Sequence, residues 1–122
     1  MDLGLGKTVV DRQVAKDLCT AQGGMLPEPR NQQENDFLNS METEAFFLGT
    51  TDLAVEGRWV WDSDGSVLTW TFWKTAEPDA GTKQNCAIML RNNNAQYEEQ
   101  WASEWCYLEK RPKAVVCERK CK

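Results

Sequence analysis

The sequence predicts an α+β domain, because two amphipathic helical segments in the first third are followed by short runs of β-forming residues. Five cysteines in a chain of 122 residues add a disulfide framework to that prediction. The length suits one compact domain, which we expect to span residues 1–122, with a tail at 119–122 outside the core.

The first helix is expected over residues 11–22. Asp11 has the side chain of an N-cap, and the Gly23-Gly24 pair ends the helix. An apolar stripe at helical spacing is formed by Val14, Ala15, Leu18 and Cys19. Because the stripe carries a cysteine, we expect this helix to be cross-linked to the core.

The second helix is expected over residues 31–41. Asn31 followed three residues later by Glu34 is a capping-box pattern. Phe37, Leu38 and Met41 are expected to form its buried face.

Beyond residue 44 the apolar residues form short runs separated by turns, as in strands. The five predicted strands are residues 45–49, 58–61, 67–72, 86–90 and 114–118. Residues 62–65, Asp-Ser-Asp-Gly, lack the later ligands of an EF-hand loop, so we expect a tight turn there. Two polar stretches, residues 74–85 and 91–100, are expected to be long loops, which are often functional.

Composition excludes several classes of function. Histidine is absent, so the chain has no Ser-His-Asp or Cys-His nucleophile pair, and we expect no enzymatic activity. Nineteen acidic against fourteen basic residues give a net charge of −5, which disfavours nucleic acid. No apolar run approaches the ~20 residues of a membrane span, so membrane insertion is not expected.

The cysteines favour disulfides in an oxidising compartment over a zinc site, since there is neither a CxxC pair nor a histidine. We therefore expect a secreted or extracellular protein. Five cysteines cannot all pair within the chain. Cys121 near the end is the candidate for the unpaired thiol, either free or in a disulfide-linked dimer.

Motifs along almost the whole chain, residues 7–118, resemble the C-type lectin-like domain family. The matching pieces are Ala15 to Cys19, Gly23-Gly24, Glu34-Asn35, Phe37-Leu38, Phe47-Leu48-Gly49, Thr51-Asp52, Glu56-Gly57-Arg58-Trp59, Trp70, Trp73, Glu77-Pro78-Asp79, Asn85-Cys86-Ala87, Trp101, Cys106 and Val116-Cys117-Glu118. The resemblance implies a short-form domain in which two helices flank two small antiparallel sheets. It also implies disulfides Cys19–Cys117 and Cys86–Cys106, with Cys121 left over.

In sugar-binding members, a calcium ion is held by the residues around a cis proline, an acidic residue before the third framework cysteine and an Asn-Asp pair after the tryptophan. The resemblance places Glu77 and Asp79 in the first two positions. The acidic position is instead Gln84, and the Asn-Asp pair is Ala102-Ser103. Calcium prefers six to eight oxygens with several carboxylates, so we expect affinity of millimolar order or weaker. Glu104 or Glu99 is a candidate substitute ligand.

A second, auxiliary calcium position of the family would use Asp52 and Glu56, with positions that here are Ala80, Gln84 and Asn85. The alternative is that Asp52 caps a turn and Glu56 lies in a solvated loop. Glu77 and Asp79 likewise have an alternative as a retained scaffold turn.

The six tryptophans are expected to pack mainly in the core, and Trp59 and Trp61 share one strand face. Trp105 lies next to Cys106 and a polar loop. With Tyr97 it offers either an aromatic binding surface or further core packing.

The leading hypothesis is carbohydrate recognition with a weakened or absent calcium requirement, as in host defence or cell-surface recognition by similar domains. The expected ligand-binding residues are Glu77, Asp79, Gln84, Asn85, Ser103, Glu104 and Trp105. The expected partner is a glycan or a cell-surface glycoprotein. Calcium-independent protein binding by the same loops is the alternative, and ice or mineral binding is a weaker third hypothesis.

Overall fold

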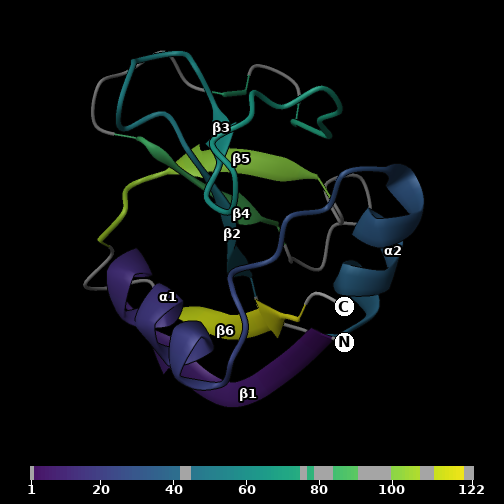
Figure 1. The fold of residues 1–122 in the computed structure, drawn as a ribbon, viewed down its shortest axis with the longest axis vertical. Helices are drawn as coiled ribbons and strands as arrows, with labels where there is room; N and C mark the ends of the chain where they lie inside the picture. Colours follow the sequence, from purple (N-terminus) through teal and green to yellow (C-terminus); the bar gives the residue numbers. More distant parts are fainter. Residues whose placement is uncertain are drawn as a thin grey trace.

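A mixed β-sheet with two helices beside it forms the domain in the computed structural model (Figure 1). The structure describes residues 2–41, 45–74, 77–78, 84–90, 100–107 and 112–119. Six strands make up the sheet: β1 (Asp2–Val9), β2 (Phe46–Thr51), β3 (Val60–Trp61), β4 (Cys86–Met89), β5 (Trp101–Glu104) and β6 (Lys113–Glu118). Their order is β1-β6-β2-β4-β5, and β3 also pairs with β2.

The predicted α+β class is confirmed, but the strands join in one sheet rather than in two antiparallel ones. The link is a single parallel pairing of β2 with β6, at Phe46 and Ala114. All other strand pairs are antiparallel.

One predicted strand is absent, and two observed strands were not predicted. Residues 67–72 form no strand, since an isolated bridge between Val67 and Val60 is their one β-pairing among the described residues. The turn at 62–65 is confirmed: Gly65 has a φ of +71°, and Ser66 donates its N–H to Asp64 at 2.9 Å. β1 and β5 were not expected. β1 is rich in glycine and pairs with β6 from the far end of the chain, while β5 contains two polar residues that are nevertheless buried.

Both helices begin as predicted. α1 (Arg12–Ala21) is capped by Asp11, which accepts the Gln13 N–H. α2 (Gln32–Met41) is preceded by Asn31, which accepts the Glu34 N–H at 2.8 Å. The Glu34 carboxylate accepts the Arg30 N–H, also at 2.8 Å, so a reciprocal cap forms one residue earlier than expected.

The predicted buried face of α2 was wrong at Phe37 and confirmed at Leu38, while the side chain of Met41 lies outside the described residues. Phe37 is 53% exposed, whereas Leu38 and Asn35, three residues apart, are buried. Residues three apart lie on the same helix face, and here that face contains a polar residue. The Asn35 side chain accepts the Trp101 indole N–H at 2.7 Å, so its burial leaves this acceptor satisfied.

Both expected disulfides are present. Cys19–Cys117 joins α1 to β6, and Cys86–Cys106 joins the start of β4 to the segment after β5. In the chain-entropy model, closing loops of these sizes stabilises the fold by about 4.7 and about 3 kcal/mol. Cys121 lies outside the described residues.

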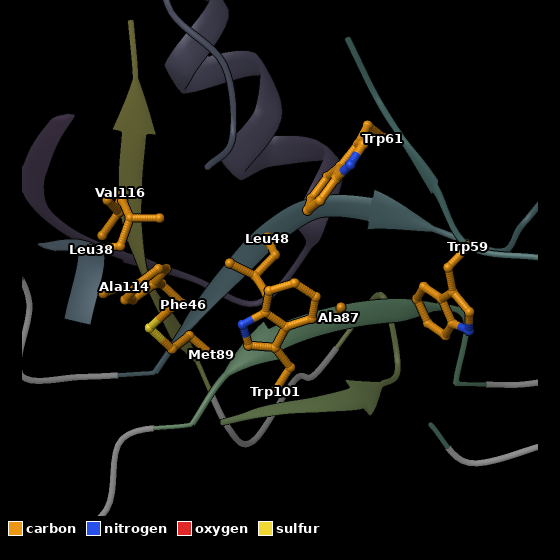
Figure 2. Close-up of a cluster of buried hydrophobic side chains, with 10 residues drawn as sticks. All are labelled: Leu38, Phe46, Leu48, Trp59, Trp61, Ala87, Met89, Trp101, Ala114 and Val116. Atoms are coloured by element: carbon orange, nitrogen blue, oxygen red, sulfur yellow. The ribbon is translucent and has the colours of Figure 1, made fainter. Parts of the chain in front are cut away.

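Trp101 lies at the centre of one of two core clusters. Figure 2 shows its indole with Trp59 and Trp61 to one side and Leu38 and Val116 to the other. The expected burial of Trp59 and Trp61 is confirmed. The Trp101 ring makes edge contacts with Trp61, Trp70 and Trp73 at centroid distances of 5.6–6.2 Å. The start of β5 is therefore fixed by aromatic packing, which anchors the neighbouring site residues.

Candidate functional site

The site residues gather where β2, β4 and β5 reach the same end of the sheet. Thr51 pairs with Cys86, and Cys86 pairs with Glu104, so these three residues form a row across the strands. Asp52 and Asn85 adjoin this row, and the Asp52 N–H donates to the Asn85 carbonyl at 3.2 Å. Sequence positions more than fifty residues apart thus come together.

Glu77 contacts Ser103. One carboxylate oxygen of Glu77, Oε1, accepts both the Ser103 N–H at 2.9 Å and the Ser103 hydroxyl at 2.6 Å. Ser103 is buried in β5 and Glu77 is half-buried. The Glu77–Pro78 peptide is cis, as the resemblance implied. The two donors occupy the acceptor sites of Oε1, so this oxygen of Glu77 does not fit a metal ligand.

Asp52 and Glu56 form a second acidic group. Asp52 Oδ2 accepts the Gly57 N–H at 2.8 Å, which confirms that Asp52 caps a turn. Asp52 Oδ1 is buried and accepts no hydrogen bond from the described residues. A hydrogen bond with Asp52, followed by desolvation and the charge of Asp52, raises the pKa of Glu56 above its ordinary value.

The remaining predicted site residues are distributed around β4 and β5. Glu104 is buried, and its Oε1 accepts the Trp105 N–H at 3.0 Å. Gln84 and Asn85 are half-buried directly before β4. Asp79, Ala80 and Glu99 lie outside the described residues.

Trp105 is 44% exposed, which decides between the two readings of this tryptophan in favour of a surface ring. Tyr107, two residues further, is 54% exposed and was not singled out from the sequence. The N–H of Arg12 donates to the Cys106 carbonyl at 2.8 Å, so α1 supports the segment that carries both rings. Tyr97, the expected neighbour of Trp105, lies outside the described residues. The signal for Tyr107 was its position beside a bridged cysteine.

A buried carboxylate at Glu28 was also missed. Glu28 accepts the Ser63 N–H at 2.9 Å, the Ser63 hydroxyl at 2.7 Å and the Arg30 guanidinium at 2.9 Å. It links the segment before α2 to the turn after β3. Its charge is paired and hydrogen-bonded, as burial requires, and this points to a structural role.

Within the described ranges, no group of three or more acidic, histidine or cysteine side chains is arranged to hold a metal ion. None of the helices described is long and apolar enough to cross a membrane.

A family model for the lectin C-type domain matches residues 10–119. The chain belongs to the C-type lectin domain family. A tetranectin-like protein of Carcharhinus perezii is 31% identical over 110 residues, covering 85% of this chain and 61% of that protein. Human tetranectin is 36% identical over 92 residues, covering 68% of this chain and 45% of the relative. The chain thus spans about half the length of these relatives.

Solved C-type lectin folds superpose over most of the chain. The mouse scavenger receptor C-type lectin carbohydrate-recognition domain gives a TM-score of 0.80 at 22% identity, covering 99% of this chain and 90% of that one. A calcium-independent type II antifreeze protein gives 0.77 at 20%, covering 90% and 78%. The cow CD23 domain, solved in the presence of a GlcNAc2Man3 oligosaccharide, gives 0.76 at 27%, covering 92% and 81%. C-type lectin domains are in general non-enzymatic binding domains.

Proposed function

We propose that this C-type lectin domain is an extracellular, non-enzymatic binding domain that recognises carbohydrate without calcium at Glu77. The binding surface, termed the long-loop face, comprises the described residues Glu77, Gln84, Asn85, Ser103, Glu104 and Trp105, with Asp79 beside them in the sequence. The observation that carries the proposal is the Glu77 oxygen already filled by two donors from Ser103.

Trp105 supplies the apolar part of the recognition. An indole that is 44% exposed offers a flat surface for the apolar face of a sugar ring. Glu104 precedes it, and a carboxylate is a strong acceptor for sugar hydroxyls. An aromatic surface beside acceptors is the combination that a polyhydroxylated ring requires when no ion bridges its hydroxyls.

If calcium binds the described part of the domain, Asp52 and Glu56 are the residues that would hold it. The buried Asp52 oxygen without a donor fits such a ligand. The ion would neutralise two neighbouring carboxylates and would stabilise the turn that Asp52 caps. Two carboxylates are few for calcium, so this proposal gives it low affinity and no contact with the sugar.

The relatives support this proposal at the level of the family. The oligosaccharide in the cow CD23 structure supports a glycan as the ligand class. The antifreeze protein shows that the same fold occurs in a calcium-independent protein. Two disulfides in a small domain support an extracellular location. A cell-surface glycoprotein is the proposed partner, and a dimer through Cys121 is testable on a non-reducing gel.

The test is a glycan array probed with the domain in chelator. We expect binding to at least one glycan class, and Trp105→Ala should weaken that binding about five- to twelvefold, because stacking contributes on the order of 1–1.5 kcal/mol. Phe37→Ala is the matched control, since Phe37 is also an exposed aromatic residue but lies on α2. Equal loss in both variants, or no loss in Trp105→Ala, would remove Trp105 from the site.

Calcium-independent protein binding is the second candidate. Leu53 and Val55, in the loop after β2, are 62% and 57% exposed, and apolar side chains in an exposed loop suit a protein partner. This candidate predicts an array without hits and cell binding that survives enzymatic removal of glycans. Carbohydrate recognition predicts the reverse for both measurements.

A further inference from the structure

We infer that the two hydrogen bonds between Glu77 and Ser103 take the place of a bound ion in holding the segment at Glu77 against β5. We term this contact the fastening. This inference deepens the proposed function, on which it rests for the assignment of Glu77 to the binding face. The fastening is built into the chain, so the face is held in place without metal.

β5 is an edge strand, and its outer side is paired by the segment that leads to Glu77. The Trp101 N–H donates to the Phe72 carbonyl at 2.8 Å, and the Lys74 N–H donates to the Trp101 carbonyl at 2.8 Å. These bonds form a short parallel pairing, with Trp73 opposite Trp101. An edge strand with unpaired amides invites pairing with other chains, so this cover is protective.

The parallel pairing does not continue at Ser103. If the parallel pairing continued two residues further along both segments, the Ser103 N–H would donate to the Lys74 carbonyl, as the Trp101 N–H donates to the Phe72 carbonyl. The Lys74 carbonyl instead accepts the Glu77 N–H at 2.9 Å. The Glu77 carboxylate supplies the acceptor that the Ser103 amide would otherwise have found on the main chain, at 2.9 Å.

The Ser103 hydroxyl completes the fastening. It donates to the same Glu77 oxygen at 2.6 Å, so one side chain and one amide of β5 both hold the carboxylate. Bonds to a charged acceptor are shorter and stronger than neutral ones. Ser103 is buried, which limits competition from water. An ion bound between Glu77 and β5 would need an acceptor oxygen from residue 103. The Ser103 N–H and hydroxyl instead both donate to Glu77.

Ser103→Asp tests the exchange directly. The substitution puts a second carboxylate against Glu77, which then requires a cation to offset the repulsion. In chelator we expect the variant to melt at least about 5 °C below the wild type. About 10 mM calcium should restore at least half of that loss. The measured quantity is the calcium-induced shift in Tm of the variant minus that of the wild type. This difference removes any contribution to Tm from calcium bound at Asp52 and Glu56, because both proteins share it.

Glu77→Gln is the matched control, because its amide oxygen still accepts both Ser103 donors without a charge. It should keep the wild-type response to calcium. A calcium-induced shift in the wild type that Glu77→Gln abolishes would place the ion on Glu77 and overturn the inference. A variant with Ser103→Asp that responds to calcium no more than the wild type would also overturn it.

If Ser103→Asp does not fold, the calcium response of the wild type and of Glu77→Gln decides alone: equal responses support the inference, and a response lost in Glu77→Gln overturns it. These readouts measure stability and not glycan binding. Failure of the glycan array would therefore overturn the proposed function and leave the fastening intact.

Discussion

The hydrogen bond between Asn35 and Trp101 connects α2 to the strand that carries the site, and its removal gives a measurable prediction. Both side chains are fully buried, and the Trp101 indole N–H donates to Asn35 Oδ1 at 2.7 Å. Asn35→Leu keeps the number and branching of the side-chain heavy atoms but removes the acceptor. A buried donor left without a partner costs about 1–3 kcal/mol.

For a domain of this size, 1 kcal/mol corresponds to about 4 °C in Tm, so Asn35→Leu should lower Tm by about 4–12 °C. Urea denaturation followed by tryptophan fluorescence gives the free energy of unfolding, and the slope m should not change. In a Trp101→Phe background the indole N–H is absent, and Asn35→Leu should cost at least about 1 kcal/mol less. Equal costs in both backgrounds, or a cost below about 0.5 kcal/mol in the wild type, would show that the Asn35–Trp101 hydrogen bond does not stabilise the fold.

Four further substitutions have expected outcomes. Gly49→Ala should destabilise the domain by about 1–3 kcal/mol in the same urea assay, because an added Cβ would meet a backbone carbonyl at 2.9 Å; a cost near zero would mean that the strand shifts easily. Asp52→Asn should return the pKa of Glu56 toward its ordinary value in a carboxyl NMR titration, and an unchanged pKa would contradict the assigned cause. Phe37→Ser should change the free energy of unfolding by less than about 0.5 kcal/mol, whereas Leu38→Ala should cost about 2–5 kcal/mol; similar costs would place both side chains in the core.

Local signals predicted the elements that depend on nearby residues. The Asp11 and Asn31 caps follow from side chains that bond amides two or three residues away, and the turn ending at Gly65 follows from its composition. The disulfides and the class of fold came from motifs of the resemblance. β1 was missed because its partner, β6, lies at the other end of the chain, and alternation with glycine gives a weak strand signal.

The residues of the site were predictable from the sequence, but their hydrogen-bond partners were not. Sequence comparison with the lectin pattern showed that an acidic ligand is absent at Ser103, yet not that Ser103 donates two hydrogen bonds to Glu77. That contact depends on the Lys74 carbonyl, which accepts the Glu77 N–H and does not pair with β5, and local sequence does not specify this choice of partner. Similarly, Phe37 was expected in the core because apolar spacing cannot show that Asn35 has a buried partner.

We propose that the long-loop face binds its ligand without calcium, because Ser103 already holds Glu77. The most direct measurement is the affinity of the domain for a glycan captured on the array, determined in excess chelator and again in about 10 mM calcium. The two dissociation constants should agree within about twofold, which corresponds to about 0.4 kcal/mol. A loss of affinity of about tenfold or more in chelator would contradict the claim.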